Sequence, residues 1–354
     1  MRSSTDQADA PARPGRPRFT RKRSGPLRVL APLLAVLVLL VLITESLALG
    51  SRTLSPEEVW QGLLAYDNSV ASKVVWGLRI HRTILAIVVG ASLAVAGVVM
   101  QGLTRNPLAE PGILGINAGA SLSVVLSMSL LGLTDVSDFL WFAFAGAALA
   151  AFLVHLMSVR SADAGPARLV LAGVALGASL RSITGTITMY DSVTFDSYRF
   201  WVLGSLADRD AVLLVWVAPF LVVGLVLALA SGLTLNALAL GEEQAKALGV
   251  SPRRARALAL TSITLLCGAS TAAVGPISFV GLVVPHVLRL ALGADQRKLL
   301  AVSVVAGPVL LLAADILGRV ILDSGEMEAG VVTAFIGGPV LLLMVIQRMG
   351  VRGR

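Results

Sequence analysis

Residues 83–101 read TILAIVVGASLAVAGVVMQ and contain no charged side chain. A helix rises about 1.5 Å per residue, so a stretch of this length is close to the roughly 20 residues that cross the hydrocarbon core of a membrane. The segment therefore predicts a membrane-spanning helix, and its composition can be compared with that of the whole chain.

The composition of the whole chain is that of a membrane protein. Of its 354 residues, 56% are hydrophobic and 14% are charged, whereas soluble domains carry about 25% charged residues. Aromatic residues are only 5%, so the apolar residues are mainly aliphatic, and 34 glycines favour close helix packing in lipid. The single cysteine, Cys267, excludes a disulfide framework, and three histidines leave too few ligands for a His- and Cys-rich metal centre.

Nine further apolar stretches raise the expected number of spans to about ten. The third and the eighth are short or interrupted by Gly and Pro, which a membrane tolerates only where protein or water satisfies the backbone groups. We therefore expect an all-α polytopic membrane protein. Its spans lie near Leu27–Leu49, Thr83–Gln101, Ile113–Leu133, Phe139–Ser158, Leu169–Tyr190, Ala211–Ser231, Ala257–Val274, Phe279–Leu292, Leu299–Gly318 and Val331–Gln347.

The distribution of Lys and Arg predicts the orientation. With the N-terminus inside, 21 of the 29 basic residues fall in inner segments, seven in outer segments and Arg181 within a span. This positive-inside bias accounts for the net charge of +8 without a nucleic-acid partner, and it places both termini in the cytoplasm. Residues 1–26 are expected to form a disordered basic tail before a membrane domain at 27–350. A cleaved signal peptide is disfavoured because the apolar run is too long and no A-x-A site follows.

The sequence lacks the motif by which many ATPases bind nucleotide. No Gly-Lys pair occurs in the sequence, so a Walker A loop cannot form. We expect no cofactor to bind directly, no enzymatic activity, and any ATP to be hydrolysed by a partner.

Five motifs follow one another between Arg79 and Gln347, over about three quarters of the chain. Together they resemble the FecCD-type permeases, the membrane subunits of ABC importers for ferric siderophores, haem and cobalamin. The motifs are RIHR (79–82) with GASLAVAG (90–97), QGLTRNPLAEP (101–111) with LGINAGA (114–120), LGEEQAKALGV (240–250), VGPISFVGLVVPH (274–286) and VVTAFIGGP (331–339).

This resemblance implies a set of partners and a function. The expected partners are a dimer of ATPase subunits, a second permease (identical or paralogous), an extracytoplasmic substrate-binding protein and membrane lipid. The expected function is import across the bacterial inner membrane, with an iron(III)-siderophore complex as cargo. The segments at 104–112, 199–201 and 204–206 are nearest to those of catecholate siderophore permeases, and haem or cobalamin remains the alternative cargo within the family.

The segment around Glu242 is expected to be a short inner helix. Gly241 precedes two acids suited to a helix N-terminus, Gly249 is suited to end the helix, and Ser251-Pro252 can cap the next one. By resemblance this is the coupling helix that contacts the ATPase, and a solvated connecting helix would carry the same caps. The residues assigned to it are Gly241, Glu242, Glu243, Ala245, Leu248 and Gly249, of which Ala245 and Leu248 are three apart on one face.

Three arginines lie at outer ends of the expected spans: Arg79, Arg82 and Arg319. By resemblance they receive glutamates of the binding protein, for which the planar guanidinium is suited; anchoring to lipid headgroups is the alternative. Asp315, four residues before Arg319, could pair with it. His81 replaces the usual proline in a loop at 79–82, and Glu328 adds an unusual acid nearby.

Polar residues within the spans are candidates for the translocation path. Arg181 lies near mid-membrane, where a charge normally faces water or a partner; it either faces the path and favours an anionic cargo or forms a structural pair. By resemblance Asn106, Pro107 and Leu108 stand at the inner mouth and could form a gate. His286 and Cys267 are expected to be structural. Residues 55–64 are expected to form a surface helix that begins with a capping box at Ser55-Pro56-Glu57-Glu58.

Two other function classes are weighed against this one. An ion-driven secondary transporter predicts acidic residues buried in mid-span, whereas the acids here lie in loops and at span ends, with Asp315 the nearest exception. A membrane-embedded enzyme would need a convergent cluster of His, Cys or carboxylate groups, which the sequence does not suggest.

Overall fold

The computed structural model describes residues 27–50, 53–64, 69–159, 166–322 and 325–352, so the expected disordered tail at 1–26 lies outside the described residues. Within these ranges the regular structure is helical and no strand occurs. The elements are α1 (Leu27–Ala48), α2 (Pro56–Leu64), α3 (Val70–Val74), the π-helix η1 (Val75–Arg79), α4 (Ile80–Thr104), the 3₁₀ turn η2 (Pro111–Leu114), α5 (Ile116–Leu131), α6 (Val136–Val159), α7 (Pro166–Tyr190), α8 (Ser192–Val202), α9 (Ala211–Ala230), α10 (Gly232–Ala239), α11 (Glu242–Ala247), α12 (Pro252–Val274), α13 (Val280–Leu292), α14 (Gln296–Val320) and α15 (Ala329–Arg352).

The predicted all-α polytopic fold is confirmed. Each of the ten expected spans coincides with a helix, namely α1, α4, α5, α6, α7, α9, α12, α13, α14 and α15. In the described part of the chain, eight helices are long and apolar enough to cross a membrane, and α5 and α13 are the shorter apolar ones. These two are the third and eighth spans, which the sequence already shows to be short or interrupted.

The helix that contains residues 83–101 is longer than its sequence suggests. Helical structure is continuous from Val70 to Thr104 through α3, η1 and α4. The loop expected at 79–82 is therefore wrong: these residues are helical. A proline at position 81 would remove a backbone donor and disturb the preceding turn, and His81 removes that obstacle.

α4 forms the centre of the molecule and packs against α14, α12 and α13. Glycines allow two of these approaches. A Cβ added to Gly97 would lie 2.0 Å from the carbonyl oxygen of Gly281 on α13, and one added to Gly90 would lie 2.8 Å from that of Gly307 on α14. The backbones can therefore touch only because these positions carry no side chain.

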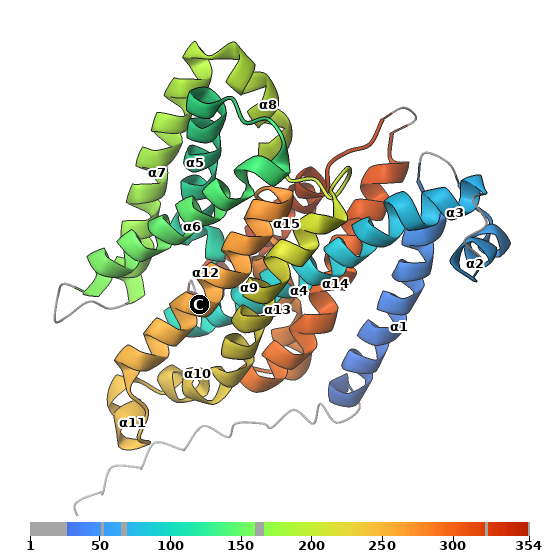
Figure 1. The fold of residues 1–354 in the computed structure, drawn as a ribbon. Helices are drawn as coiled ribbons and strands as arrows, with labels where there is room; N and C mark the ends of the chain where they lie inside the picture. Colours follow the sequence, from blue (N-terminus) through green and yellow to red (C-terminus); the bar gives the residue numbers. More distant parts are fainter. Residues whose placement is uncertain (1–26, 51–52, 65–68, 160–165, 323–324, 353–354) are drawn as a thin grey trace, which may run out of the picture.

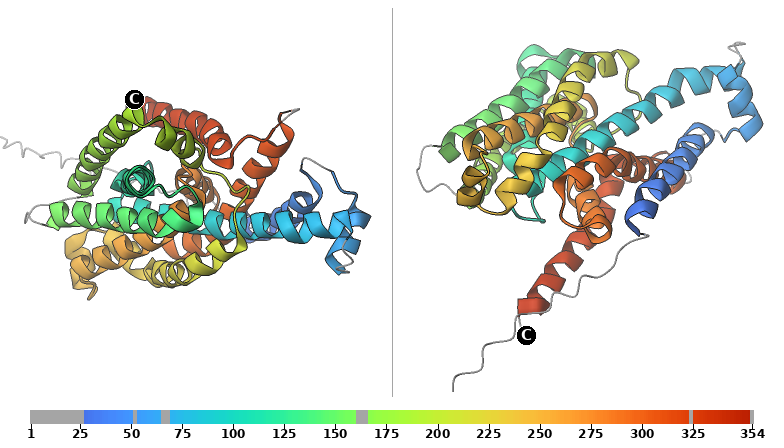
Figure 2. Two further views of the ribbon diagram at one scale, coloured as in Figure 1. Left: turned by 45° about the horizontal axis from the view of Figure 1, so that its top comes forward. Right: turned by 90° about the horizontal axis from the view of Figure 1, so that it is seen from below.

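The other helices surround this centre in two groups. Figure 1 shows α5 to α8 on one side of the molecule, where α6 packs against α12, and α1 on the opposite side. In the right-hand view of Figure 2, the C-terminal part of α15 extends beyond the neighbouring helices. Large apolar side chains of α1, α7 and α15 are exposed, as expected for helices that meet lipid or another membrane subunit.

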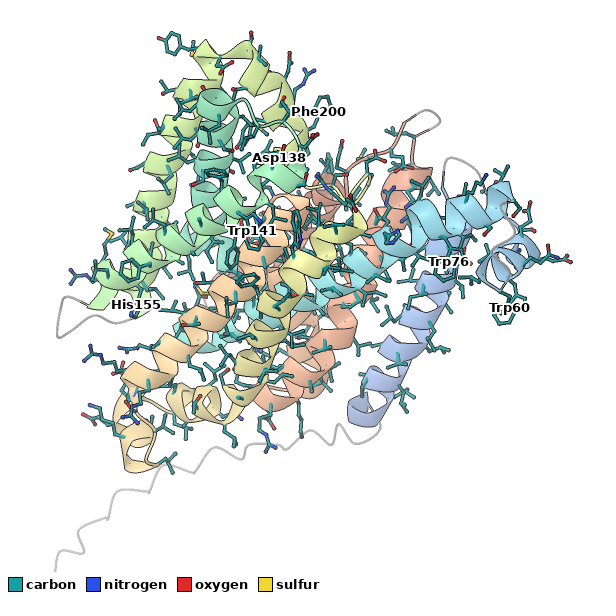
Figure 3. The ribbon with its side chains drawn as sticks, in the orientation of Figure 1. Trp60, Trp76, Asp138, Trp141, His155 and Phe200 are labelled. Atoms are coloured by element: carbon teal, nitrogen blue, oxygen red, sulfur yellow. The ribbon has the colours of Figure 1, made fainter. Side chains whose placement is uncertain are left out.

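The two ends of the bundle differ in their elements. Figure 1 places α2 and α3 at one end and α11 at the other. The end with α2 and α3 also carries Trp60 and Trp76 (Figure 3), and the Trp76 indole donates to the carbonyl oxygen of Gly62 at 2.9 Å. Tryptophan is typical of membrane–water interfaces. We refer to this end as the outer end, following the predicted orientation.

Candidate functional site

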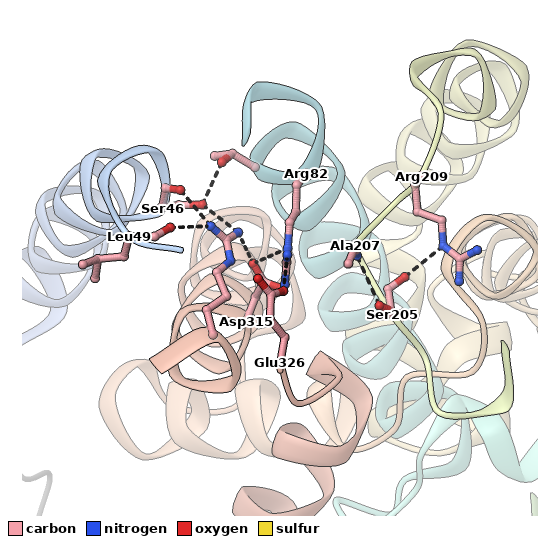
Figure 4. A network of polar contacts seen from close by, with 10 residues as sticks. Ser46, Leu49, Arg82, Ser205, Ala207, Arg209, Asp315 and Glu326 are labelled. Carbon is pink, nitrogen blue, oxygen red and sulfur yellow. Dashed lines mark hydrogen bonds and ion pairs between the residues drawn. The ribbon is translucent and has the colours of Figure 1, made fainter. Parts of the chain in front are cut away.

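Asp315 on α14 is the centre of a buried polar network at the outer end (Figure 4). Its side chain is 1% exposed and accepts hydrogen bonds from Arg82 Nε at 3.0 Å, from Arg82 Nη2 at 2.8 Å and from Arg319. Arg82 also donates to Glu326 Oε2 at 2.6 Å, in the loop before α15. The network therefore joins α4, α14 and the α14–α15 loop. The predicted Asp315–Arg319 pair is confirmed.

Two arginines cap the C-terminal end of α1. Arg79 Nη1 donates to the carbonyl oxygens of Leu47 and Ala48, at 2.5 and 2.8 Å, and Arg319 Nη1 donates to those of Ser46 and Leu49, at 2.8 and 3.1 Å. The last carbonyls of a helix have no partner within the helix and carry partial negative charge. The two guanidinium groups supply hydrogen-bond donors for these carbonyls and positive charge for the end of the helix. They therefore fix α1 to the body of the protein.

The three arginines expected to dock a partner are thus not equally accessible. Arg79 is 5% exposed and Arg319 is 6% exposed, and both face the C-terminal end of α1. Arg82 is 14% exposed and already contacts two carboxylates. The sequence places all three residues at outer span ends, but it does not show that they point inward.

A cavity of about 490 Å³ opens beside this network. Its lining includes Arg82 and Glu326 on one side and Arg209, from the loop between α8 and α9, on the other. Phe200, Trp201 and Glu328 also line it. No sequence motif marks Arg209, and only the fold brings it to the same cavity as Arg82.

At the inner end, α11 has the local structure that the sequence predicts. Gly241 and Gly249 adopt φ values of +120° and +78°, which favour glycine. The Ser251 hydroxyl accepts from Arg254 N at 3.5 Å, Pro252 opens α12, and Glu242 forms an ion pair with Arg256 on that helix. This pair connects α11 to the start of a membrane span.

The two residues expected on one contact face, Ala245 in α11 and Leu248 directly after it, differ in burial. Ala245 is completely buried, whereas Leu248 is 62% exposed. Ala245 packs against the body of the protein and Leu248 projects from it. The surface available to a partner consists of Leu248 and the other exposed residues of this segment, Glu243, Gln244, Lys246, Ala247 and Gly249.

The expected path residues lie in two places. Arg181 is exposed on α7 and makes no hydrogen bond or ion pair with another residue that the structure describes. Asn106, Pro107 and Leu108 are half-buried in the turn that follows α4, where Asn106 Oδ1 accepts from Leu108 N at 3.1 Å. Arg181 and this turn belong to different elements, and the roles of both in the path stay predictions.

Two further polar contacts at the inner half were not expected. Glu110 accepts from the backbone N–H of Phe279, at the start of α13. Asn236 on α10 donates to Asp295 Oδ1 at 2.9 Å and accepts from Gln296 N at 2.9 Å. The hydrogen bond from Asn236 holds the pKa of Asp295 below its ordinary value. Both contacts join segments far apart in sequence, and no local sequence pattern indicates such contacts.

No group of three His, Cys, Asp or Glu side chains that could hold a metal ion occurs among the residues that the structure describes.

The predicted capping box is confirmed, since Ser55 N donates to Glu58 Oε2 at 2.7 Å and Glu58 N donates to Ser55 Oγ at 3.2 Å. Cys267 is 3% exposed among apolar residues of the core, as expected for a structural position.

The chain is similar to known membrane permeases over most of its length. The profile of the FecCD transport family matches residues 37–347. The chain is 43% identical to the ferric enterobactin transport system permease protein FepD of Escherichia coli (strain K12), over 88% of this chain and 94% of that protein. It is 41% identical to the vitamin B12 import system permease protein BtuC of Vibrio cholerae serotype O1, over 85% and 89%.

A solved structure shares the fold. It is described as an inward-facing conformation of a metal-chelate type ABC transporter, and it superposes with a TM-score of 0.79 at 27% sequence identity. The alignment covers 90% of this chain and 99% of that chain.

Proposed function

The chain belongs to the FecCD transport family of ABC importer permeases, and we propose that it moves iron(III)-siderophore complexes across the bacterial inner membrane. The observation that carries the proposal is the 43% identity to a ferric enterobactin permease over 88% of the chain. The whole membrane domain, and not one motif, takes part in that similarity.

The proposed cycle needs a partner at each end. A loaded substrate-binding protein docks on the outer end, an ATPase dimer holds the inner end, and a second permease forms the other wall of the path. ATP binding and hydrolysis in the ATPase subunits move α11, and this motion changes which end of the path is open. No covalent chemistry is required of this chain.

Contact with the ATPase is proposed for the exposed side of α11. Leu248 supplies an apolar side chain that is 62% exposed, and the charged residues Glu243 and Lys246 surround it. The Glu242–Arg256 ion pair links the same helix to α12, which packs against α9, α4 and α6 in the bundle. A displacement of α11 therefore has a direct route to the spans. Gly241 and Gly249 support the turns on either side.

Docking of the binding protein is proposed for the outer end around Arg82. This arginine is the most exposed of the three that the sequence suggests. Arg79 and Arg319 support the surface from inside, because they hold the end of α1 in place.

Selection for an anionic cargo is proposed for Arg181. Its charge is uncompensated within the described part of the chain and lies within a span. A charged side chain in a membrane normally faces water or a partner, and an anionic ferric chelate would be attracted to it. Arg181→Gln should therefore reduce uptake of an anionic chelate. Unchanged transport by a normally expressed variant would remove this role.

The cargo is tested by uptake of radiolabelled iron in a deletion strain that carries the transporter on a plasmid. Ferric enterobactin, ferric citrate, haem and cobalamin are offered separately. We expect accumulation with a ferric catecholate and none without the ATPase gene. Uptake of cobalamin alone would instead support the second candidate function, a cobalamin importer, which the 41% identity to a vitamin B12 permease favours.

The proposed inner gate is tested in the same assay by exchanging Asn106, Pro107 and Leu108 for alanine.

A further inference from the structure

We propose that the groove between α6 and α12 binds an anionic phospholipid of the inner leaflet, with one acyl chain along the groove and the phosphate at Arg254. Such a site needs only the predicted orientation of the protein in the membrane, and it does not depend on the cargo proposed above. It is separate from the translocation path and from the two docking surfaces.

The groove is a largely apolar space of about 220 Å³ between the two helices. Among the residues that line it are Ala148, Ala151 and His155 of α6, and Ala257, Thr261 and Leu265 of α12. Alanine at three of these positions leaves the space between the helices unfilled. The hydroxyl of Thr264, which also lines the groove, donates to the carbonyl oxygen of Leu260 at 2.8 Å, so it is satisfied within its own helix.

The groove lies in the inner half of the membrane. Along α6 it runs from Ala148 to His155, one turn before that helix ends. Along α12 it begins at Ala257, within two turns of the start of the helix, and continues to Leu265. These stretches rise about 10 and 12 Å, and half of the hydrocarbon core is about 15 Å thick. The groove therefore has nearly the depth of one leaflet.

Aromatic side chains close the groove toward the outer leaflet. Phe144 lies one turn beyond Ala148 on α6, and a Cβ added to Gly268 of α12 would lie 3.4 Å from its ring. The ring centroid of Phe144 is 4.6 Å from that of Phe220 on α9. Packed rings thus bridge the helices near mid-membrane, so the groove can accept an acyl chain from the inner leaflet but not from the outer one.

Positive charge lies at the inner end of the groove. Arg254 precedes Ala257 by three residues and Thr261 by seven, so these residues share one face of α12. The Arg254 side chain is exposed, and no ion pair joins it to a carboxylate among the described residues. Arg253 is exposed beside it. An anionic headgroup would therefore meet an available guanidinium where the apolar groove reaches the inner surface.

The surroundings of the groove favour a lipid over another subunit. Leu149 and Phe152 on α6 are 58% and 59% exposed, as expected for side chains that face acyl chains. In the left-hand view of Figure 2, α12 lies on the side of the molecule away from α7, the helix that carries Arg181 and is proposed to face the path. The α6–α12 side is thus left to membrane lipid, and Arg254 selects an anionic headgroup.

The site is tested with a photoreactive phosphatidylglycerol that carries a diazirine in one acyl chain. The lipid is added in neutral detergent to the full chain, purified with the subunits that copurify with it, and crosslinked peptides are identified by mass spectrometry. We expect crosslinks within 148–155 and 257–265. Unlabelled phosphatidylglycerol should compete at about fivefold lower concentration than phosphatidylcholine with the same acyl chains, because one arginine near the headgroup favours an anionic lipid by about that factor. Glycerol 3-phosphate, which lacks the chains, should not compete.

Two substitutions separate the headgroup from the acyl chain. Arg254→Gln should make the two unlabelled lipids compete equally, while crosslinks remain at the same positions. Ala257→Phe should remove most of the crosslinks, because its ring would occupy the groove. Thr261→Phe, at an exposed position of the same lining, replaces it if Ala257→Phe does not fold.

Arg297→Gln and Ala145→Phe are the matched controls. Arg297 is an exposed basic residue at the inner end of α14, Ala145 is an exposed alanine of α6, and neither lines the groove. Both variants should retain the crosslinks and the preference for phosphatidylglycerol. Thermal stability and copurification of the ATPase are measured for every variant.

Four results would overturn the lipid site. Equal competition by both lipids in the wild type would show an unselective lipid contact, and competition by glycerol 3-phosphate as strong as that by phosphatidylglycerol would show a site for soluble phosphate. Crosslinks that persist in both phenylalanine variants would place the lipid elsewhere. Loss of the ATPase from Arg254→Gln with an unchanged lipid preference would assign Arg254 to the ATPase contact. Iron uptake is not a readout here, so failure of the lipid site and failure of the proposed function are distinguishable.

Discussion

Buried charge at the outer end is stabilising only because each charged group has several partners. Asp315 accepts from Arg82 and Arg319, and Arg319 also donates to the end of α1. A nearby hydrogen bond of 2.7 Å between the hydroxyls of Ser46 and Thr83 joins α1 to α4. Removal of one buried charge leaves the others without compensation, so single substitutions here should be costly.

Arg319→Gln tests this network. The substitution leaves Asp315 with Arg82 alone and weakens the cap of α1, so we expect a loss of about 3 kcal/mol in stability. The readout is the apparent Tm of the detergent-purified protein. Arg199→Gln, at an exposed ion pair, should change stability by less than about 1 kcal/mol. Equal melting of the two variants would show that the buried network does not support the fold.

At the scale of whole elements, the position of α13 depends on its contact with α4. Gly97 and Gly281 bring the two backbones together where η2 also meets them, since a Cβ on Gly281 would lie 3.0 Å from Pro111 Cδ. The short helix α13 can therefore be accommodated within the bundle despite its length. Pro285 lies inside it, and its missing backbone donor is tolerated in this packed position.

Gly97→Ala tests the contact between α4 and α13. The added methyl group would lie 2.0 Å from a carbonyl oxygen, so the helices must separate. We expect a loss of about 1–3 kcal/mol in stability, the usual range for overpacking, measured as reduced Tm and reduced yield of folded protein. Gly185→Ala on α7 is the control, because no atom lies within 4 Å of its added Cβ. A harmless Gly97→Ala would contradict the observed packing.

The short helix α11 allows folding and coupling to be tested separately. Leu248→Glu should leave the fold intact and reduce ATP-driven uptake at least about tenfold, because it places a charge in an apolar contact. Ala245→Leu should instead lower stability, since that site is completely buried. Leu64→Glu, at a leucine of α2 that is 70% exposed, controls for the charge itself. Normal uptake by Leu248→Glu would exclude Leu248 from the ATPase contact.

On the scale of the whole molecule, the two ends must face different compartments. Cys267 is the sole cysteine of the chain and is buried, so single introduced cysteines can be labelled without altering it. Glu243→Cys on α11 should react with a membrane-impermeant maleimide only after the cells are opened. Glu57→Cys on α2 should react in intact cells. The reverse pattern would invert the orientation on which the coupling and docking proposals depend.

Transport by the assembled molecule should depend entirely on its ATPase partner. Proteoliposomes that contain this chain with its second permease alone should accumulate no ferric chelate against a gradient. Addition of the ATPase subunits and ATP should restore uptake. Uphill uptake driven by an ion gradient in the absence of ATPase would favour a secondary transporter instead.

Much of the architecture follows from local sequence. Apolar length places the ten spans, and the weak patterns at Ile113–Leu133 and Phe279–Leu292 correspond to the shorter helices α5 and α13. Caps and turn glycines define α2 and α11. These features are predictable because helix formation, capping and partition into lipid depend on residues near one another in the chain. The sequence does not indicate that helical structure continues from α4 back to Val70, because the three polar residues at 79, 81 and 82 resemble a loop.

The sites depend on information that the local sequence does not contain. The sequence alone places Arg79, Arg82 and Arg319 at outer ends of the expected apolar spans, and it indicates that α11 is a separate short helix. Only the tertiary structure turns two of those arginines toward the end of α1, pairs Arg82 with a carboxylate 233 positions away, and leaves Arg209 facing the outer cavity. The reason is physical: the direction and the partners of a charged side chain are set by the helices packed beside it, and these come from distant parts of the chain.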